Sequence, residues 1–256
     1  MLKRIGVLLY GTISYSLFLG TFLYAVGFIG NFGVPRTIDS EPLVPLGTAL
    51  MVNFLLLGAF AVQHSVMARP VFKRWFTRIV PRQIERSTYV LLSSLLLIAL
   101  FVFWQPMGGI IWQVTDPVAQ GVLYAVFGLG WLIVLVATFL INHFDLFGLR
   151  QVWLYFRGKP YSPLKFGTPW LYRYMRHPLY VGWLLAFWAT PTMTAAHLFF
   201  AAVTTLYILV AIQLEERDLI SEHGQSYANY RKQVPMLIPS HRRRIKQGAI
   251  AAQSAG

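Results

Sequence analysis

The sequence predicts an all-α integral membrane protein with about five to six transmembrane helices. Hydrophobic residues make up 56% of its 256 positions and charged residues only 12%, which is too apolar for an ordinary soluble domain of this length. The mean hydropathy is +0.55. Its apolar residues fall into runs close to the roughly 20 residues that a helix needs to cross a bilayer.

Reading these runs as helices gives four long spans and two shorter ones, at residues 5–29, 46–67, 87–104, 118–141, 179–190 and 195–213. The first run follows Lys3 and Arg4, is too long for a signal peptide and has no cleavage site, so it is a membrane helix. The polar segment Thr190-Pro191-Thr192-Met193-Thr194 separates the last two runs. Because proline ends a helix and can begin the next one, the last two spans form a helical hairpin.

The 22 Lys and Arg residues lie almost entirely on one side of the predicted bundle. Only Arg36 lies on the other side, and the rest fall at the amino terminus, in loops 68–86 and 142–178, and from residue 217 onward. Positive residues concentrate in cytoplasmic loops. We therefore predict a protein of the bacterial inner (cytoplasmic) membrane with both termini in the cytoplasm. The net charge of +13 then reflects topology, and we expect no nucleic-acid partner.

Three regions follow along the chain. Residues 1–141 form an amino-terminal four-helix membrane region, residues 142–240 form the hairpin and a cytoplasmic cap, and residues 241–256 form a basic, flexible tail. The chain has no cysteine, which excludes disulfides, thiolate metal sites and a cysteine nucleophile. We predict no metal site and no obligate protein partner besides the lipid bilayer.

Two charged motifs flank the final hairpin. Arg176-His177-Pro178-Leu179-Tyr180-Val181-Gly182 precedes it and Glu215-Glu216 follows it. A helix that begins at a proline presents free N–H groups to a carboxylate, and Gly182 allows a ligand to approach the backbone. Adjacent acids on a helix point about 100° apart, so one can pair with an arginine while the other faces a ligand. The alternative is that these charges only reach the interface and balance one another.

With the following Tyr227, Tyr230-Arg231 and Val234–Pro239, these motifs resemble the catalytic half of the isoprenylcysteine carboxyl methyltransferase and phospholipid methyltransferase group. The resemblance covers about residues 165–240. It implies an S-adenosylmethionine-dependent membrane methyltransferase whose cytoplasmic carboxy-terminal region binds the cofactor. The cofactor-binding residues that it implies are Arg176, His177, Pro178, Tyr180, Gly182, Glu215, Glu216, Tyr227, Tyr230 and Arg231.

The amino-terminal half narrows this resemblance. Residues 63–70, 84–94 and 142–150 read QHSVMARP, IERSTYVLLSS and NHFDLFGLR, and they are similar to the NnrU-related branch and, within it, to the methanethiol S-methyltransferase family. This likeness implies that the substrate is a small hydrophobic thiol, methanethiol, which is converted to dimethyl sulfide. Three alternatives stay open: another acceptor such as an isoprenylcysteine or a lipid, an NADPH-dependent membrane reductase, and an NnrU-like protein without enzymatic activity.

Methylation of a thiol is faster when the sulfur is deprotonated, and an alkanethiol has a pKa near or above the roughly 8.5 of cysteine. Three candidate groups lie at the cytoplasmic ends of helices: His64, Arg69 and Asp145. A lone imidazole or carboxylate in apolar surroundings needs a partner. We predict that His64 or Asp145, or both as a coupled pair, accepts the thiol proton, and that Arg69 favours the thiolate. The alternative is a desolvated pocket that captures thiolate without a base.

Overall fold

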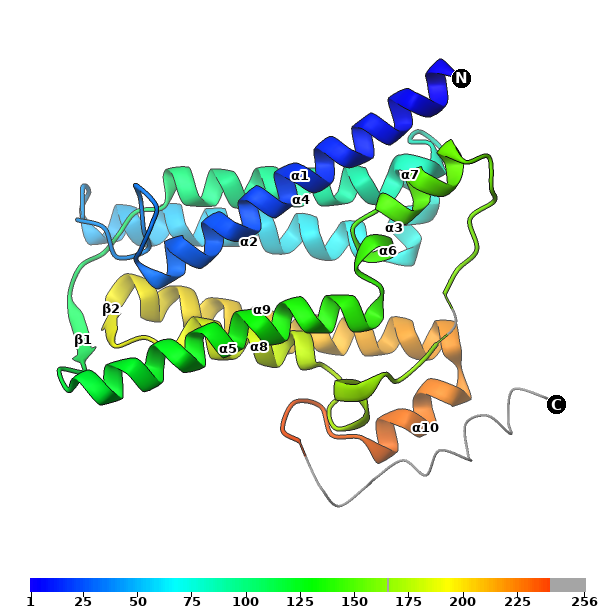
Figure 1. Cartoon of the computed structure of the whole chain (residues 1–256). Coiled ribbons are helices and arrows are strands. Elements are labelled where there is room, and N and C mark those ends of the chain that lie inside the picture. Colours follow the sequence, from blue (N-terminus) through cyan, green and yellow to red (C-terminus); the bar gives the residue numbers. More distant parts are fainter. Residues whose placement is uncertain (165, 240–256) are drawn as a thin grey trace.

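Long apolar helices form the body of the protein in the computed structural model, which describes residues 1–164 and 166–239 (Figure 1). Within the described residues, five helices are long and apolar enough to cross a membrane: α1 (Leu2–Gly30), α2 (Leu46–Ala68), α4 (Arg82–Phe103), α5 (Pro117–Ile141) and α9 (Ala195–His223). The predicted fold class, an all-α integral membrane protein, is therefore confirmed. The predicted flexible tail at 241–256 lies outside the described residues.

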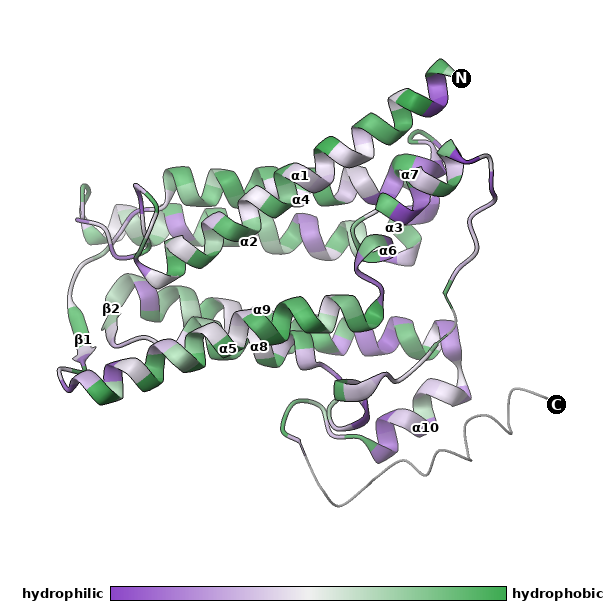
Figure 2. Ribbon diagram, in the orientation of Figure 1, coloured by the Kyte–Doolittle hydropathy of each residue, from purple (hydrophilic) through white to green (hydrophobic). Residues whose placement is uncertain are grey.

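Shorter elements complete the chain: α3 (Pro70–Phe76), β1 (Ile110–Gln113), α6 (His143–Leu146), α7 (Leu149–Phe156), the 3₁₀ helix η1 (Trp170–Arg173), α8 (Pro178–Trp188), β2 (Thr192–Thr194) and α10 (Gln225–Gln233). In Figure 1 the strands lie at one end of the bundle, and the amino terminus, α3, α7 and α10 lie at the other. Hydrophilic residues gather at that second end (Figure 2).

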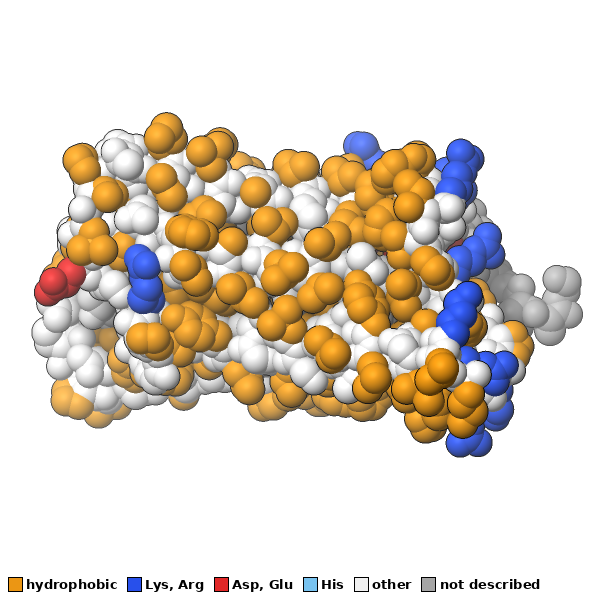
Figure 3. Space-filling model, turned by 90° about the horizontal axis from the view of Figure 1, so that it is seen from above, with side chains coloured by type: hydrophobic (Ala, Val, Ile, Leu, Met, Phe, Trp, Pro, Cys, Tyr) orange, Lys and Arg blue, Asp and Glu red, His pale blue; other side chains and the backbone are white. Residues whose placement is uncertain are grey.

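Lys and Arg side chains also gather at the end that carries α10, which we call the basic end; the end with β1 and β2 is the sheet end (Figure 3). Apolar side chains cover most of the surface between the two ends in this view, as expected for a surface that faces lipid. The sorting of charge seen in the sequence is therefore a sorting along the long axis of the bundle. Which end faces the cytoplasm stays a prediction.

A cluster of buried aromatic and aliphatic side chains fills the bundle. It joins α1, α4, α5, α8 and α9 through side chains that include Phe28, Leu100, Phe127, Phe187 and Phe200. Helices from both sides of the predicted boundary at residue 141 contribute to this cluster. In particular, α8, which follows the boundary, packs extensively against α5, which precedes it. The division of the chain at residue 141 stays a prediction.

Helix α8 has 11 residues, about 16 Å at 1.5 Å per residue, and is too short to cross the hydrocarbon core alone. The chain continues from it in extended form, and β2 pairs antiparallel with β1, where Met193 lies opposite Trp112. The Trp112 indole N–H also donates to the Thr190 carbonyl oxygen at 3.2 Å. The polar break of the hairpin thus lies at the sheet end, and extended chain completes the crossing that α8 begins.

Two glycines let α5 and α8 approach closely. A Cβ atom on Gly182 would lie 2.7 Å from the Gly130 carbonyl oxygen and 2.8 Å from the Val134 amide nitrogen, which is too close for a real side chain. A Cβ atom on Gly130 would lie 2.6 Å from the Ala186 nitrogen. The close approach at Gly182 is therefore that of a neighbouring helix, and the role of this residue in cofactor binding stays a prediction.

Helix α9 is longer than the apolar run that predicted it. The run ends near residue 213, whereas the helix continues to His223 and carries Glu215 and Glu216 on its last turns. Hydropathy marks only the part of a helix inside hydrocarbon, and Glu, Arg and Leu are good helix formers beyond that boundary. The two acids are thus held on a rigid helix at the basic end.

Candidate functional site

A buried carboxylate organises the basic end. The side chain of Glu216 on α9 is 2% exposed and has three partners, of which Arg176 and His177 form hydrogen bonds with it and Arg231 forms an ion pair. Its Oε1 atom lies 2.6 Å from Arg176 Nε and 3.1 Å from His177 Nε2, and its Oε2 atom lies 2.9 Å from Arg231 Nε. Both carboxylate oxygens therefore have positively charged or hydrogen-bonding partners, as a buried charge requires. We call these four residues the Glu216 cluster.

The Glu216 cluster joins three segments that are far apart in the sequence. Arg176 and His177 lie just before α8, Glu216 lies on α9 and Arg231 lies on α10. Because Nε2 of His177 faces a carboxylate oxygen, this nitrogen carries the imidazole proton. The sequence analysis anticipated that one of the two adjacent acids pairs with an arginine, and the structure brings all of these residues together.

The chain after α10 folds back onto the start of α8. The backbone N–H groups of Arg176 and His177 donate to the carbonyl oxygens of Pro235 and Met236 at 2.9 and 3.2 Å. The Arg176 guanidinium also donates to the carbonyl oxygen of Arg231 at 3.0 Å and to that of Val234. This return segment therefore forms a cap that closes over the buried side of Glu216.

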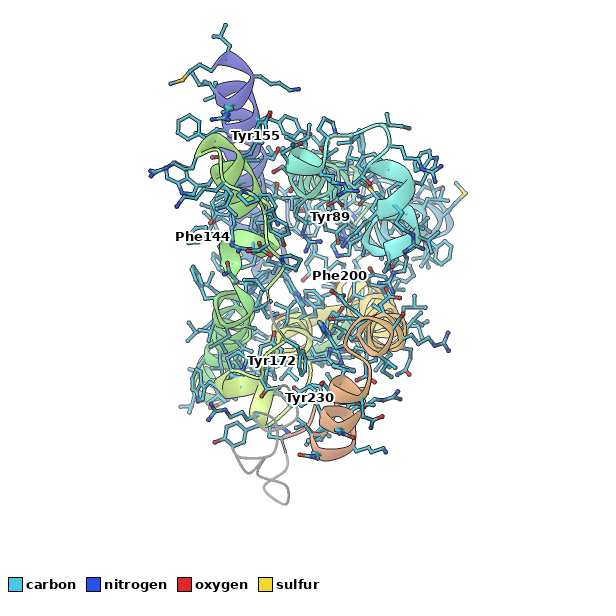
Figure 4. All side chains as sticks on the ribbon, turned by 90° about the vertical axis from the view of Figure 1, so that its right-hand side faces the viewer. Tyr89, Phe144, Tyr155, Tyr172, Phe200 and Tyr230 are labelled. Carbon is cyan, nitrogen blue, oxygen red and sulfur yellow. The ribbon has the colours of Figure 1, made fainter. Side chains whose placement is uncertain are left out.

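Tyr227 and Tyr230 form the inside of the cap. Both are buried and pack against Phe166, and the Tyr230 hydroxyl donates to the Tyr172 carbonyl oxygen at 2.6 Å. Figure 4 shows Tyr172 and Tyr230 side by side at this end of the molecule. Burial raises the pKa of both cap tyrosines above the ordinary value, so their hydroxyls are neutral. The structure gives these two predicted site residues a packing role.

Glu215 differs from its neighbour because its side chain is 42% exposed. One oxygen accepts a hydrogen bond from the Tyr180 hydroxyl at 2.9 Å. A carboxylate offers about four lone-pair positions, so most of its accepting capacity remains after this contact. Of the two acids, Glu215 is therefore the one that can accept hydrogen bonds from a ligand, with Tyr180 fixing its orientation.

His64 lies on α2 and contacts α4. The Tyr89 hydroxyl lies 2.9 Å from the Nε2 atom of His64 and 3.0 Å from its Nδ1 atom, and Nδ1 also lies 3.3 Å from Ser93 Oγ. The Ser93 hydroxyl donates to Gln63, and the Tyr89 hydroxyl can donate to whichever ring nitrogen of a neutral His64 carries no proton. His64 and the Tyr89 hydroxyl thus form a pair that sequence reasoning missed, although Tyr89 lies within the quoted segment 84–94.

Asp145 has a separate set of partners. Its Oδ1 atom accepts from the Arg150 guanidinium at 2.8 Å, and its Oδ2 atom accepts from the Tyr161 hydroxyl at 3.3 Å. In the described part of the chain, no hydrogen bond or ion pair joins Asp145 to His64. The structure therefore does not assemble the coupled pair considered from the sequence, and it leaves the Asp145 carboxylate neutralised by an arginine.

Arg69 connects α2 to α9. It forms an ion pair with Asp218 at 2.9 Å, and its Nε atom donates to the Ser65 carbonyl oxygen at 3.1 Å. One turn earlier, the Ser65 hydroxyl contacts the Tyr207 hydroxyl at 3.1 Å. Asp218 lies three residues after Glu215 and hence on a neighbouring part of the same helix face. Glu215 is thus flanked by two contacts to the helix that carries His64.

A family model described as a protein of unknown function (DUF1295) matches residues 70–234. The methanethiol S-methyltransferase of Crocosphaera subtropica is 62% identical over 93% of this chain and 93% of its own length. The enzyme of that name from Mycobacterium tuberculosis is 55% identical over 93% of this chain and 98% of its own length.

The chain belongs to the methanethiol S-methyltransferase family. Nurim of Bos taurus is a more distant relative of this family member, 32% identical over 71% of the chain and 70% of its own length. No solved structure matches the sequence. Membership of a methyltransferase family confirms the resemblance found in the sequence. It argues against the two alternatives of a reductase and a protein without enzymatic activity.

Proposed function

We propose that the protein transfers a methyl group from S-adenosylmethionine to the sulfur of methanethiol and so forms dimethyl sulfide at the basic end of the bundle. The observation that carries this proposal is the contrast between the two adjacent acids. The Glu216 cluster fixes α8, α9 and α10, while Glu215 remains partly exposed on the α9 face that turns toward α2. The family membership supplies the reaction class.

The residues at Glu215 fit the proposed methyl donor. S-adenosylmethionine carries a sulfonium, an ammonium and a carboxylate, and therefore one excess positive charge. The Glu215 carboxylate attracts that charge and accepts hydrogen bonds from ribose hydroxyl or ammonium groups, because Tyr180 occupies only one of its positions. When bound, the donor supplies an activated methyl group for in-line transfer to a nucleophile. Arg176 and Arg231 hold Glu216 and so have a positioning role.

On the acceptor side, the contact between His64 and Tyr89 supports a role for this pair in removing the thiol proton. The Tyr89 hydroxyl lies within 3.0 Å of both ring nitrogens of His64 and can donate to the one that carries no proton. A thiol that donates its S–H proton to the Tyr89 oxygen completes a relay, in which the tyrosine proton moves to His64 and the thiol proton replaces it. The thiolate sulfur then accepts the methyl group, and the product is a neutral thioether. The imidazolium later releases its proton to water. Asp145 is a weaker candidate base because Arg150 already neutralises it.

One assay tests the proposal. Purified protein in detergent receives S-adenosylmethionine and, separately, methanethiol, longer alkanethiols and an isoprenylcysteine. We expect dimethyl sulfide and S-adenosylhomocysteine in equal amounts with methanethiol, and lower turnover with the bulkier acceptors. S-adenosylhomocysteine without a volatile thioether would refute the acceptor and keep the methyltransferase. Absence of both products with every acceptor would refute the proposed reaction.

A further inference from the structure

A cavity of about 680 Å³ lies at the basic end between the start of α4 and the segment that contains α6 and α7. Among the described residues that line it, none belongs to the Glu216 cluster, and neither His64 nor Glu215 is present. The proposed reaction therefore leaves this cavity without an assigned ligand.

Positive charge dominates the lining of the cavity. The charged residues that line it are Lys73, Arg82, Arg86, Lys159, Glu85 and Asp145. Four cations thus face two carboxylates, and Arg150 from outside the lining already neutralises Asp145. The cavity carries an excess of positive charge that favours an anionic ligand.

Two of these cations have no counter-ion within contact distance. In residues 1–164 and 166–239, the side chains of Arg82 and Lys159 form no ion pair and no hydrogen bond. Burial and the neighbouring Arg86 guanidinium lower the pKa of Lys73 below its ordinary value, and the opposite effect of the Glu85 and Glu222 carboxylates does not cancel this shift. An anion that contacts these groups would remove their mutual repulsion.

The methyl donor does not match this charge. S-adenosylmethionine is itself a cation, so a cavity with excess positive charge repels it, whereas the exposed Glu215 carboxylate attracts it. A phosphate group has the opposite sign and suits Arg and Lys donors. The electrostatics therefore separate this cavity from the proposed donor site.

An open groove of about 430 Å³, lined by both polar and apolar atoms, adjoins the cavity and shares Ile141, Asn142 and Leu164 with it. The groove follows the end of α5, where Phe139 and Phe144 are exposed on the part of the surface that would face lipid. A basic cavity next to exposed Phe139 and Phe144 side chains matches a ligand with an anionic head and a hydrocarbon chain. A soluble phosphate would use only the first of these two surfaces.

The Gln151 side chain indicates which chemical group the headgroup should carry. Its side chain lines the cavity, and its amide nitrogen donates to Asp145. Its Oε1 atom is buried and has no hydrogen-bond partner in the described part of the chain. A buried acceptor without a donor costs about 1–3 kcal/mol. A headgroup that carries a hydroxyl, such as glycerol, would supply the missing donor.

We propose that the cavity and its groove bind one anionic phospholipid, with the phosphate near Arg82 and Lys159 and an acyl chain along Phe139 and Phe144. The bound lipid joins the start of α4 to the end of α5 and so stabilises the basic end. This site is independent of the proposed methyl-transfer reaction.

Native mass spectrometry of the protein in detergent tests this site. The titrant is phosphatidylglycerol, and phosphatidylcholine with the same acyl chains is the zwitterionic comparison. We expect the wild-type protein to retain one phosphatidylglycerol. In Arg82→Gln/Lys159→Gln we expect the affinity to fall by a factor of about ten or more, which is equivalent to losing one charge-assisted hydrogen bond. Arg74→Gln/Arg78→Gln is the matched control because it removes two exposed cations of the same end that do not line the cavity.

A second variant tests the groove. Phe144→Ala keeps all the charges of the cavity, and we expect it to weaken phosphatidylglycerol binding through loss of acyl-chain contact. Equal loss in the cavity pair and the control pair would show diffuse attraction to the basic end and overturn the site. Equal retention of phosphatidylcholine, or displacement of phosphatidylglycerol by inorganic phosphate, would overturn the proposed lipid.

Discussion

At the scale of residues, the two adjacent acids on α9 divide their roles because they point in different directions. The sequence indicated that one acid can pair with an arginine while the other faces a ligand, since neighbouring helical residues diverge by about 100°. It could not show which one, because that depends on the rotation of α9 relative to α8 and α10. Packing decides it: Glu216 points at Arg176 and Arg231, and Glu215 meets Tyr180.

The first prediction compares the two acids. Glu216→Gln removes the buried negative charge and leaves Arg176, whose side chain is 10% exposed, without a counter-ion. Breaking a buried ion pair on one side costs about 3–5 kcal/mol, so the midpoint of thermal unfolding in detergent should fall by about 6 °C or more. Glu215→Gln should keep the wild-type midpoint and weaken S-adenosylmethionine binding, measured by calorimetry. Equal midpoints for the two variants would contradict the division of roles.

His64 was identified from the sequence as a polar residue in an apolar helix, but its partner was not. Tyr89 contributes a hydroxyl from α4, and the contact depends on how α2 and α4 pack. Asp145 was found by the same reasoning, and the structure pairs it with Arg150 instead. Sequence reasoning thus located isolated polar groups and could not assign their partners, which tertiary packing supplies.

The second prediction concerns the thiol proton. His64→Ala and Tyr89→Phe should each lower kcat/KM for methanethiol about a hundredfold at neutral pH, as expected for loss of general-base catalysis. The deficit should shrink as the pH rises through the thiol pKa of about 8.5 or above, because solution then supplies the thiolate. Asp145→Asn is the control and should keep the wild-type pH profile. If all three variants keep near-normal kcat/KM from acidic to alkaline pH, the relay is absent.

At the scale of elements, apolar runs located the five long apolar helices of residues 1–164 and 166–239, because the thickness of the bilayer sets their length. The ends were less accurate: α4 begins at Arg82, ahead of its apolar run, and α9 continues to His223. The pairing of β1 with β2 was not predicted, because it joins two short segments far apart in the sequence. Neither strand has the length or alternation that would mark it in isolation.

The third prediction tests the packing of α5 against α8. Gly182→Ala places a methyl group against the Gly130 carbonyl oxygen, so we expect a loss of about 1–3 kcal/mol of stability from overpacking. Gly128→Ala, on α5, is the control because a Cβ atom there has no neighbour within 4 Å. That control should be neutral or slightly stabilising, since alanine is the better helix former. Thermal unfolding in detergent distinguishes the two, and equal midpoints would show that α8 can move away from α5.

At the scale of the whole molecule, the sorting of charge explains how the chain brings distant motifs together. The positive residues cluster at one end of the bundle, and that end carries the loops of both halves of the chain (Figure 3). After α2 ends near His64 and Arg69, the chain crosses the bundle through α4, α5, α8 with its extended continuation, and α9. Because this is an even number of crossings, Glu215 and Glu216 return to the end where α2 ends. The family motifs therefore meet because each lies at the same end of its helix.

The last prediction tests the orientation of this arrangement in the membrane. The chain has no cysteine, so a single introduced cysteine reports its own location without background. Thr115→Cys lies in the exposed connection between β1 and α5 at the sheet end, and Ser226→Cys lies on the exposed face of α10 at the basic end. Positive residues stay on the cytoplasmic side, so a membrane-impermeant maleimide applied to intact cells should label Thr115→Cys alone. After the membrane is permeabilised, both variants should react. Labelling of Ser226→Cys in intact cells would reverse the orientation, and it would place the methyl-donor site on the side of the membrane away from the cytoplasmic supply of S-adenosylmethionine.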